Sequence, residues 1–106
     1  MIQAAFNTRH LDGDCRFLIL CDHASNYVPL ALDSLGLPPA YLSRHIAYDP
    51  GAVDVARLVA DRLACPLVEA GFSRLLIDPN RGLDDPTLVM KFSDGVMIPA
   101  NRAVDR

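Results

Sequence analysis

Residues 16–29, which read RFLILCDHASNYVP, decide the fold of this chain. The apolar run after Arg16 is bounded by a charged segment before it and by turn-forming residues after it, which predicts a buried strand over residues 16–21. The polar residues that follow are expected in the crevice at the strand's carboxyl end, where open α/β sheets bind ligands. His23 and Asn26 are three positions apart, so one helical turn would place both on one face.

The clearest helix is expected after Asp49-Pro50-Gly51. Asp49 suits the N-cap and Pro50 the first helical position. The helix spans about 14 residues, with one apolar face towards a sheet. Its apolar positions follow helical spacing: Ala52, Val55, Ala56, Val59 and Leu63.

Two further strands are predicted, over residues 66–69 and 74–77. A strand, a helical crossover and a strand indicate an α/β fold with a mostly parallel sheet and flanking helices. Short helical segments are expected at 30–37 and 40–46, and loops at 7–14 and 82–106. The 106 residues form a single domain.

Composition narrows the class of protein. Hydrophobic residues make up 51% of the chain and charged residues 22%, as in a globular protein. The net charge of −3 and a pI near 5.4 argue against a nucleic-acid binder. No apolar run approaches the roughly 20 residues of a membrane span, and no signal-peptide pattern opens the chain, so a cytoplasmic location is expected. Three cysteines form no disulfide framework.

The polar loop offers candidates for chemistry. His23, near Asp22 and Asn26, is a candidate metal ligand, general base or hydrogen-bonded structural histidine. Ser25 lacks the GxSxG surroundings of a nucleophile. Asn26 has an alternative role in satisfying the loop backbone.

Other candidates reach the same crevice from later segments. His45 and Asp49 lead into the predicted helix, where the N-cap role alone also explains Asp49. Arg81 can hold a substrate carboxylate through two parallel hydrogen bonds, and Asn80 adds a donor. The alternative for Arg81 is a salt bridge to Asp78, Asp84 or Asp85.

Several motifs taken together resemble the N-formylglutamate amidohydrolase family. They are CDHASNYVP, RHIAYDPGA, SRLLIDPNR, DDPTLV, SDG and IPANR, in the family's order and spacing from about residue 16 to 102. The resemblance implies a phosphorylase/hydrolase-like fold related to zinc carboxypeptidases and aspartoacylases, of which this chain is the truncated, N-terminal part. It implies hydrolysis of the amide of an N-acyl amino acid, such as N-formylglutamate, with a divalent metal, expected to be zinc.

The resemblance also implies site residues. His23-Ala24-Ser25-Asn26 aligns with the HxxE zinc motif of the related enzymes, and Asn80-Arg81 with their carboxylate-binding pair. The expected metal ligands are His23, Asn26 and a third residue from His45, Asp22 or Asp49, with Asp22 taken first. Beyond the two aligned motifs, the expected catalytic residues are His23, Asp49 and His45, and the expected substrate-binding residues are Asn80, Arg81 and Ser25. The chain departs from the carboxypeptidase pattern in having Asn26 in place of Glu, no histidine after His45, and no glutamate except Glu69.

Two other functions remain open. One is a non-catalytic domain that binds a small carboxylate through Asn80 and Arg81. The other is a cysteine hydrolase using Cys21, which requires a thiolate activated by His23. The expected partner is a small N-acyl amino acid rather than nucleic acid or a membrane. A homo-oligomer is also considered, because a truncated sheet leaves an unpaired edge.

Overall fold

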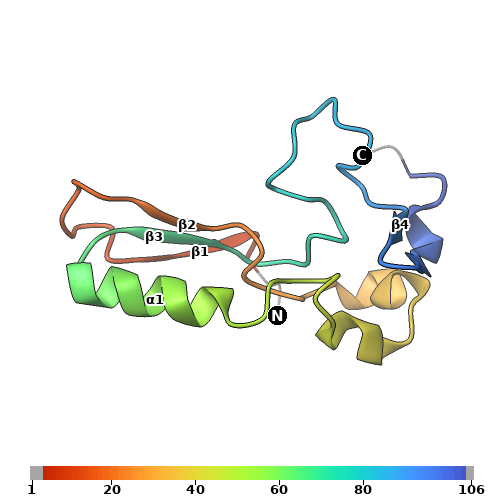
Figure 1. Cartoon of the computed structure of the whole chain (residues 1–106), viewed down its shortest axis with the longest axis horizontal. Coiled ribbons are helices and arrows are strands. Elements are labelled where there is room, and N and C mark those ends of the chain that lie inside the picture. The colour runs from red at the N-terminus through yellow and green to blue at the C-terminus, as the bar shows by residue number, and fades with distance from the viewer. Residues whose placement is uncertain (1–3, 105–106) are drawn as a thin grey trace.

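The computed structural model describes residues 4–104. A three-stranded sheet is built from β1 (Phe6–Arg9), β2 (Ile19–Cys21) and β3 (Leu67–Ala70), in the order β1-β3-β2. Strand β2 runs parallel to β3, and helix α1 (Ala52–Leu63) connects them and lies along the sheet (Figure 1). The predicted strand–helix–strand unit is therefore confirmed, and the fold is a mixed α/β fold.

The expectation of a mostly parallel sheet is not confirmed. Strand β1 pairs antiparallel with β3, in a segment that was predicted as a loop. All four residues of β1 are exposed, so the strand has no alternation of buried and exposed side chains that would identify it in the sequence. Beyond it, the Gly71 amide donates to the Ala5 carbonyl at 2.8 Å.

The strand predicted over residues 74–77 is wrong. This segment forms turns, and the Leu76 amide donates to the Ser73 carbonyl at 3.1 Å. The Ser73 hydroxyl donates to the Ala47 carbonyl and accepts from the Leu75 amide, which fixes the turn locally. Its apolar residues fill a core rather than a sheet, and Leu75 is buried there.

Helix α1 starts later than predicted. Its N-cap is Gly51, whose φ of +84° lies in the left-handed region that glycine adopts without strain. Asp49 contributes only its backbone carbonyl, which accepts from the Ala52 amide at 3.1 Å. The Asp49 side chain is consequently available for other contacts.

Two apolar clusters hold the fold together. One lies between the sheet and α1 and consists of Cys21, Ala60, Cys65 and Leu67. The other consists of Leu35, Leu37, Ile46, Ala47, Leu75 and Ile98. No helix among the described residues is long and apolar enough to cross a membrane.

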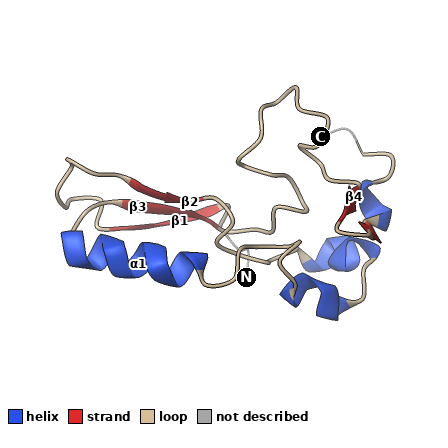
Figure 2. Ribbon diagram, in the orientation of Figure 1, coloured by secondary structure: helices blue, strands red, loops and turns tan. Residues whose placement is uncertain are grey.

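The second cluster is enclosed by short elements, which Figure 2 shows on the side away from α1. They are the 3₁₀ helices η1 (Leu30–Gly36), η2 (Pro39–Ser43) and η3 (Pro99–Asn101), and the hairpin of β4 (Phe92–Ser93) and β5 (Val96–Met97). The short helices expected near 30–37 and 40–46 are thus present as 3₁₀ turns. The hairpin interrupts a segment that was predicted to be a loop.

Candidate active site

His23 lies between two carboxylates at the carboxyl end of β2. Its Nε2 is 2.8 Å from Asp78 Oδ1, and its Nδ1 is 3.2 Å from Asp49 Oδ2. The His23 side chain is only 11% exposed. The backbone reinforces this arrangement, because the Asp49 amide donates to the His23 carbonyl at 3.0 Å. A partly buried histidine with a carboxylate at each ring nitrogen is suited to holding and transferring a proton.

Asp78 is the buried carboxylate of this site. Burial is the largest influence on its pKa and raises it, but hydrogen bonds from His23, the Asn80 amide and Arg81 together lower the pKa below its ordinary value. The Asn80 amide donates to Oδ1 at 2.9 Å. Asp78 is therefore ionised at neutral pH and accepts a hydrogen bond from Nε2 of His23. In the tautomer that donates from Nε2, Nδ1 is an acceptor, and Arg74 Nη1 at 3.2 Å is the donor that faces it.

Arg74 ties this side of the site to the chain around residues 45–49. Its Nη1 lies 3.2 Å from Asp49 Oδ1 and 3.2 Å from His23 Nδ1. Its Nε donates to the Ile46 carbonyl at 2.9 Å, and its Nη2 donates to the His45 carbonyl. The guanidinium thus fixes Asp49 against His23 and adds a positive charge beside the two acids.

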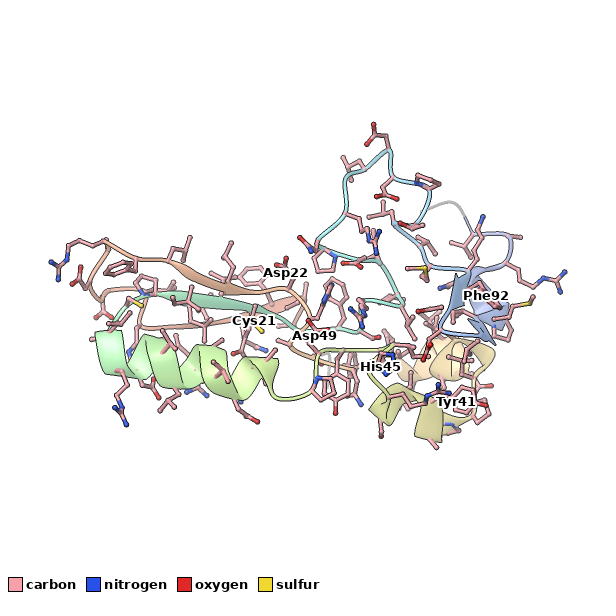
Figure 3. The ribbon with its side chains drawn as sticks, in the orientation of Figure 1. Cys21, Asp22, Tyr41, His45, Asp49 and Phe92 are labelled. Atoms are coloured by element: carbon pink, nitrogen blue, oxygen red, sulfur yellow. The ribbon has the colours of Figure 1, made fainter. Side chains whose placement is uncertain are left out.

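The structure brings Asp49 to His23, as predicted, but not the His45 side chain. His45 is 64% exposed, and its Nε2 lies 3.3 Å from Asp94 in the turn between β4 and β5. Figure 3 shows Asp49 close to Cys21 and Asp22, with His45 further towards the short helices. His45 reaches the site only through its backbone carbonyl, which Arg74 binds.

Ser25 and Asn26 serve the loop that follows β2. The Ser25 hydroxyl accepts from the Tyr27 amide at 3.0 Å, and the Asn26 amide group donates to the Leu42 carbonyl at 2.8 Å. This is the backbone role considered for Asn26 in the sequence. Among the described residues, the His23 ring contacts Asp49, Asp78 and Arg74, and forms no hydrogen bond with Asp22 or Asn26.

The donor chemistry of the site suits a metal ion only in part. Imidazole and carboxylate groups, as in His23 and its neighbours, are ligands that zinc accepts. Between residues 4 and 104, however, no group of three or more His, Cys, Asp and Glu side chains is arranged to hold a metal ion. The zinc set of His23, Asn26 and Asp22 therefore stays a prediction.

Asn80 and Arg81 contact the two carboxylate oxygens of Asp78. Arg81 Nε is 3.4 Å from Asp78 Oδ2, and its Nη1 donates to the Thr87 hydroxyl at 2.9 Å. The salt bridge considered as an alternative for Arg81 is thus formed. Asn80 lines an open groove of about 740 Å³ together with Asp22, His23 and Asp49.

Cys21 does not suit the cysteine-hydrolase alternative. Its side chain is buried in the cluster beneath α1. Burial raises the pKa of the thiol, and Glu69, Asp49 and Asp22 raise it further. The reactive form of a cysteine is the thiolate, which this environment disfavours.

Sequence reasoning missed the central roles of Asp78 and Arg74. Both belong to the segment SRLLIDPNR, which was read as a strand followed by turn-formers. The motif carried the only available signal, because Asp78 lies 55 positions from the histidine that it contacts.

The chain thus combines a mixed α/β fold with a histidine flanked by acids at the carboxyl end of a strand. A family model described as N-formylglutamate amidohydrolase matches residues 15–106. The chain belongs to this family.

A solved structure supports the same relationship. The chain is similar to the crystal structure of gene product Atu2144 from Agrobacterium tumefaciens, with a TM-score of 0.91 and 37% sequence identity. The match covers 95% of this chain and 40% of that chain, so this chain spans less than half the length of that protein. No curated protein was found to match.

Proposed function

We propose that this chain forms the His23-containing part of a hydrolase that cleaves the amide of an N-acyl amino acid such as N-formylglutamate. The family match supports the amidohydrolase class. The observation that carries the proposal is the placement of His23 between Asp78 and Asp49 on a groove that Asn80 also lines. A relation of the fold to zinc carboxypeptidases stays a prediction, as does a cytoplasmic location.

The residues divide the work as follows. Asp49, exposed beside the groove, accepts the proton of the attacking water, whose oxygen bonds to the acyl carbon. The bond between that carbon and nitrogen then breaks, and the proton goes to the departing amine. Asp78 keeps a proton on Nε2 and so orients the His23 ring. Asn80, which lines the groove, binds the carboxylate of the amino acid together with Nη2 of Arg81, the guanidinium nitrogen that neither Asp78 nor Thr87 engages.

A divalent metal, zinc in the expected case, is part of this proposal. His23 and Asp22, which line the same groove, would hold it. When bound, such an ion polarises the carbonyl and lowers the pKa of a coordinated water to about 7.

Zinc binding tests the metal part without any assay of turnover. Zinc affinity and metal content of the purified chain are measured by isothermal titration calorimetry and elemental analysis. We expect zinc binding to the wild type, loss of binding in His23→Ala, and retention in His10→Ala. His10 is a suitable control because it is an exposed histidine that pairs with Asp61 on α1. Equal affinity of the two variants, or no zinc in the wild type, contradicts the metal role.

Substrate binding tests the second part. N-formylglutamate is titrated into the wild type, Arg81→Ala and the control Arg102→Ala, which removes an exposed arginine elsewhere. We expect binding to be lost in Arg81→Ala alone, and release of formate to report turnover. Binding without turnover favours the carboxylate-binding alternative, in keeping with the 40% coverage of the Agrobacterium protein. Unchanged binding in Arg81→Ala contradicts both functions.

A further inference from the structure

A second, smaller cavity lies beside the groove. Its volume is about 140 Å³, which is room for roughly four or five water molecules at about 30 Å³ each. Arg74 and Asp78 form part of its walls, and both contact His23, which lines the groove. These two side chains therefore lie between the cavity and the candidate active site.

The peptide carbonyls of the apolar wall residues already accept hydrogen bonds. The buried Asn101 amide group donates to the carbonyls of Leu75 and Met90, at 2.7 and 2.8 Å. The carbonyl of Ile46 accepts from Arg74 Nε at 2.9 Å. These walls consequently offer little to a ligand that donates hydrogen bonds.

The acidic group in the wall is also occupied. Asp78 Oδ1 accepts from the His23 ring and from the Asn80 amide, at 2.8 and 2.9 Å. Its Oδ2 lies 3.4 Å from Arg81 Nε. The Asp78 carboxylate therefore has a donor at each oxygen before any ligand enters the cavity.

Donor groups of the walls, in contrast, remain open. Ser93, half-buried on β4, lines the cavity, and its hydroxyl forms no hydrogen bond within residues 4–104. Arg81 also lines the cavity, and its Nη2 is engaged by neither Asp78 nor Thr87. Because Nη2 has two N–H groups, one of them stays available beside the carboxylate that Asn80 binds in the proposed function.

The charges around the cavity permit an anion, and the open donors favour one. Two guanidinium groups and one carboxylate belong to the walls. Asp49 lies 3.2 Å from one guanidinium and Asp85 lies 3.9 Å from the other, so the excess of positive charge is small. Hydrogen bonds from a guanidinium to a carboxylate are about twice as strong as those between neutral groups, which favours a carboxylate over a neutral carbonyl.

We propose that this cavity binds a small carboxylate, with Ser93 and Arg81 as its hydrogen-bond donors. In the proposed reaction this carboxylate is the acidic side chain of the N-acyl amino acid, an assignment that rests on the proposed function. The small volume admits a carboxylate on a short aliphatic chain, and Met90 and Leu75 provide apolar walls for the chain. Ser93 is thus a residue that selects acidic over neutral substrates.

Calorimetry with two ligands tests the side-chain assignment. N-formylglutamate and N-formylnorvaline, whose side chain ends in a methyl group, are titrated into the wild type, Ser93→Ala and Ser43→Ala. Ser43 is the matched control because it is an exposed serine at the end of η2 that does not line the cavity. We expect Ser93→Ala to weaken binding of N-formylglutamate about tenfold, through loss of a hydrogen bond to a charged group, and to leave binding of N-formylnorvaline unchanged. Equal binding of N-formylglutamate by Ser93→Ala and the wild type, or an equal loss for both ligands, overturns the assignment.

Acetate tests the cavity without any substrate. It is titrated into isotope-labelled protein while the backbone amide resonances of Ser93 and Met90 are followed by NMR, with sodium chloride at the same ionic strength as a control. We expect acetate to shift these resonances in the wild type and in Ser43→Ala, and much less in Ser93→Ala. No shift, or an equal shift with chloride, overturns the proposal.

The two measurements together distinguish the sources of the carboxylate. Acetate shifts at Ser93, combined with equal binding of N-formylglutamate by the wild type and Ser93→Ala, assign the cavity to a free short carboxylate and overturn the side-chain assignment. Acetate shifts at Ser93 without any binding of N-formylglutamate to the wild type count against the proposed function and not against the cavity.

Discussion

Replacing Asp78 by asparagine removes the charge from the buried side of the site and keeps the shape of the side chain. Asp78 is 3% exposed and accepts hydrogen bonds from the His23 ring and the Asn80 amide, with Arg81 at 3.4 Å. A hydrogen bond to a charged group contributes about 1.5–3 kcal/mol, against about 1 kcal/mol for a neutral one. The Asn80 amide keeps a neutral acceptor in the variant. We therefore expect Asp78→Asn to lower the free energy of unfolding by about 2 kcal/mol at pH 7.

The same substitution should change the dependence of stability on pH. The pKa of Asp78 in the folded chain is below its ordinary value of 3.8. A carboxyl with a lowered folded-state pKa stabilises the protein above its unfolded-state pKa, and this stabilisation is lost as the pH falls through the folded-state value. The stabilisation from Asp78 is consequently complete at pH 7 and declines below about pH 4. Asp78→Asn, which does not titrate, should lack this part of the acid-dependent loss.

Urea denaturation followed by far-ultraviolet circular dichroism measures both effects, at pH 7 and at intervals down to pH 3. Asp84→Asn is the control, since Asp84 is an exposed acid in the loop after the site. We expect the control to match the wild type at every pH. The reasoning is refuted if Asp78→Asn has the stability of the wild type at pH 7, or declines as steeply in acid.

Other predictions concern the stability of the two sheets. Arg57→Ala leaves the buried Glu69 carboxylate without its partner, which lies 2.6 Å away. The free energy of unfolding, measured by urea denaturation, should fall by about 3 kcal/mol. An equal fall in an Arg57→Ala, Glu69→Gln double variant would show that the unpaired charge is not the cause. Gly71→Ala places a Cβ about 2.2 Å from the Ala4 carbonyl oxygen and should cost roughly 1–3 kcal/mol, with increased hydrogen exchange in β1. Gly95→Ala meets no atom within 4 Å and should cost only about 1 kcal/mol, for its φ of +77°; a cost equal to that of Gly71→Ala would contradict the steric explanation.

The sequence predicted the elements whose signals are local. The apolar run before Cys21, the helical spacing from Ala52 to Leu63 and the strand near Leu67 all appear in the structure. Strand β1 was missed because its exposed residues contain no alternation, and its pairing with β3 depends on residues far along the chain. The segment 74–77 was misassigned because an apolar run that fills a core looks the same in sequence as a buried strand.

The site was predictable as a set of loops but not as a set of contacts. His23, Asp49 and Arg81 were named from their positions, and the structure brings the first two into contact. The contact of Asp78 with His23 could not be predicted, because spacing along the sequence does not show which distant carboxylate a histidine contacts. His45 was also predicted to reach the site from its position before the helix, but its ring contacts Asp94 instead.

Asp49 shows how an error in predicting structure bears on function. The sequence offered two explanations for this residue, and the N-cap role alone was sufficient to account for it. In the structure Gly51 is the N-cap, and no side chain caps α1. The Asp49 carboxylate instead contacts His23 on one oxygen and Arg74 on the other. An aspartate that is half exposed, is not used by the helix and is held in place by an arginine has a defined orientation beside the groove. Since stabilisation of the helix does not explain that orientation, the contact with His23 is the observation behind the proposed role of Asp49 as a proton acceptor.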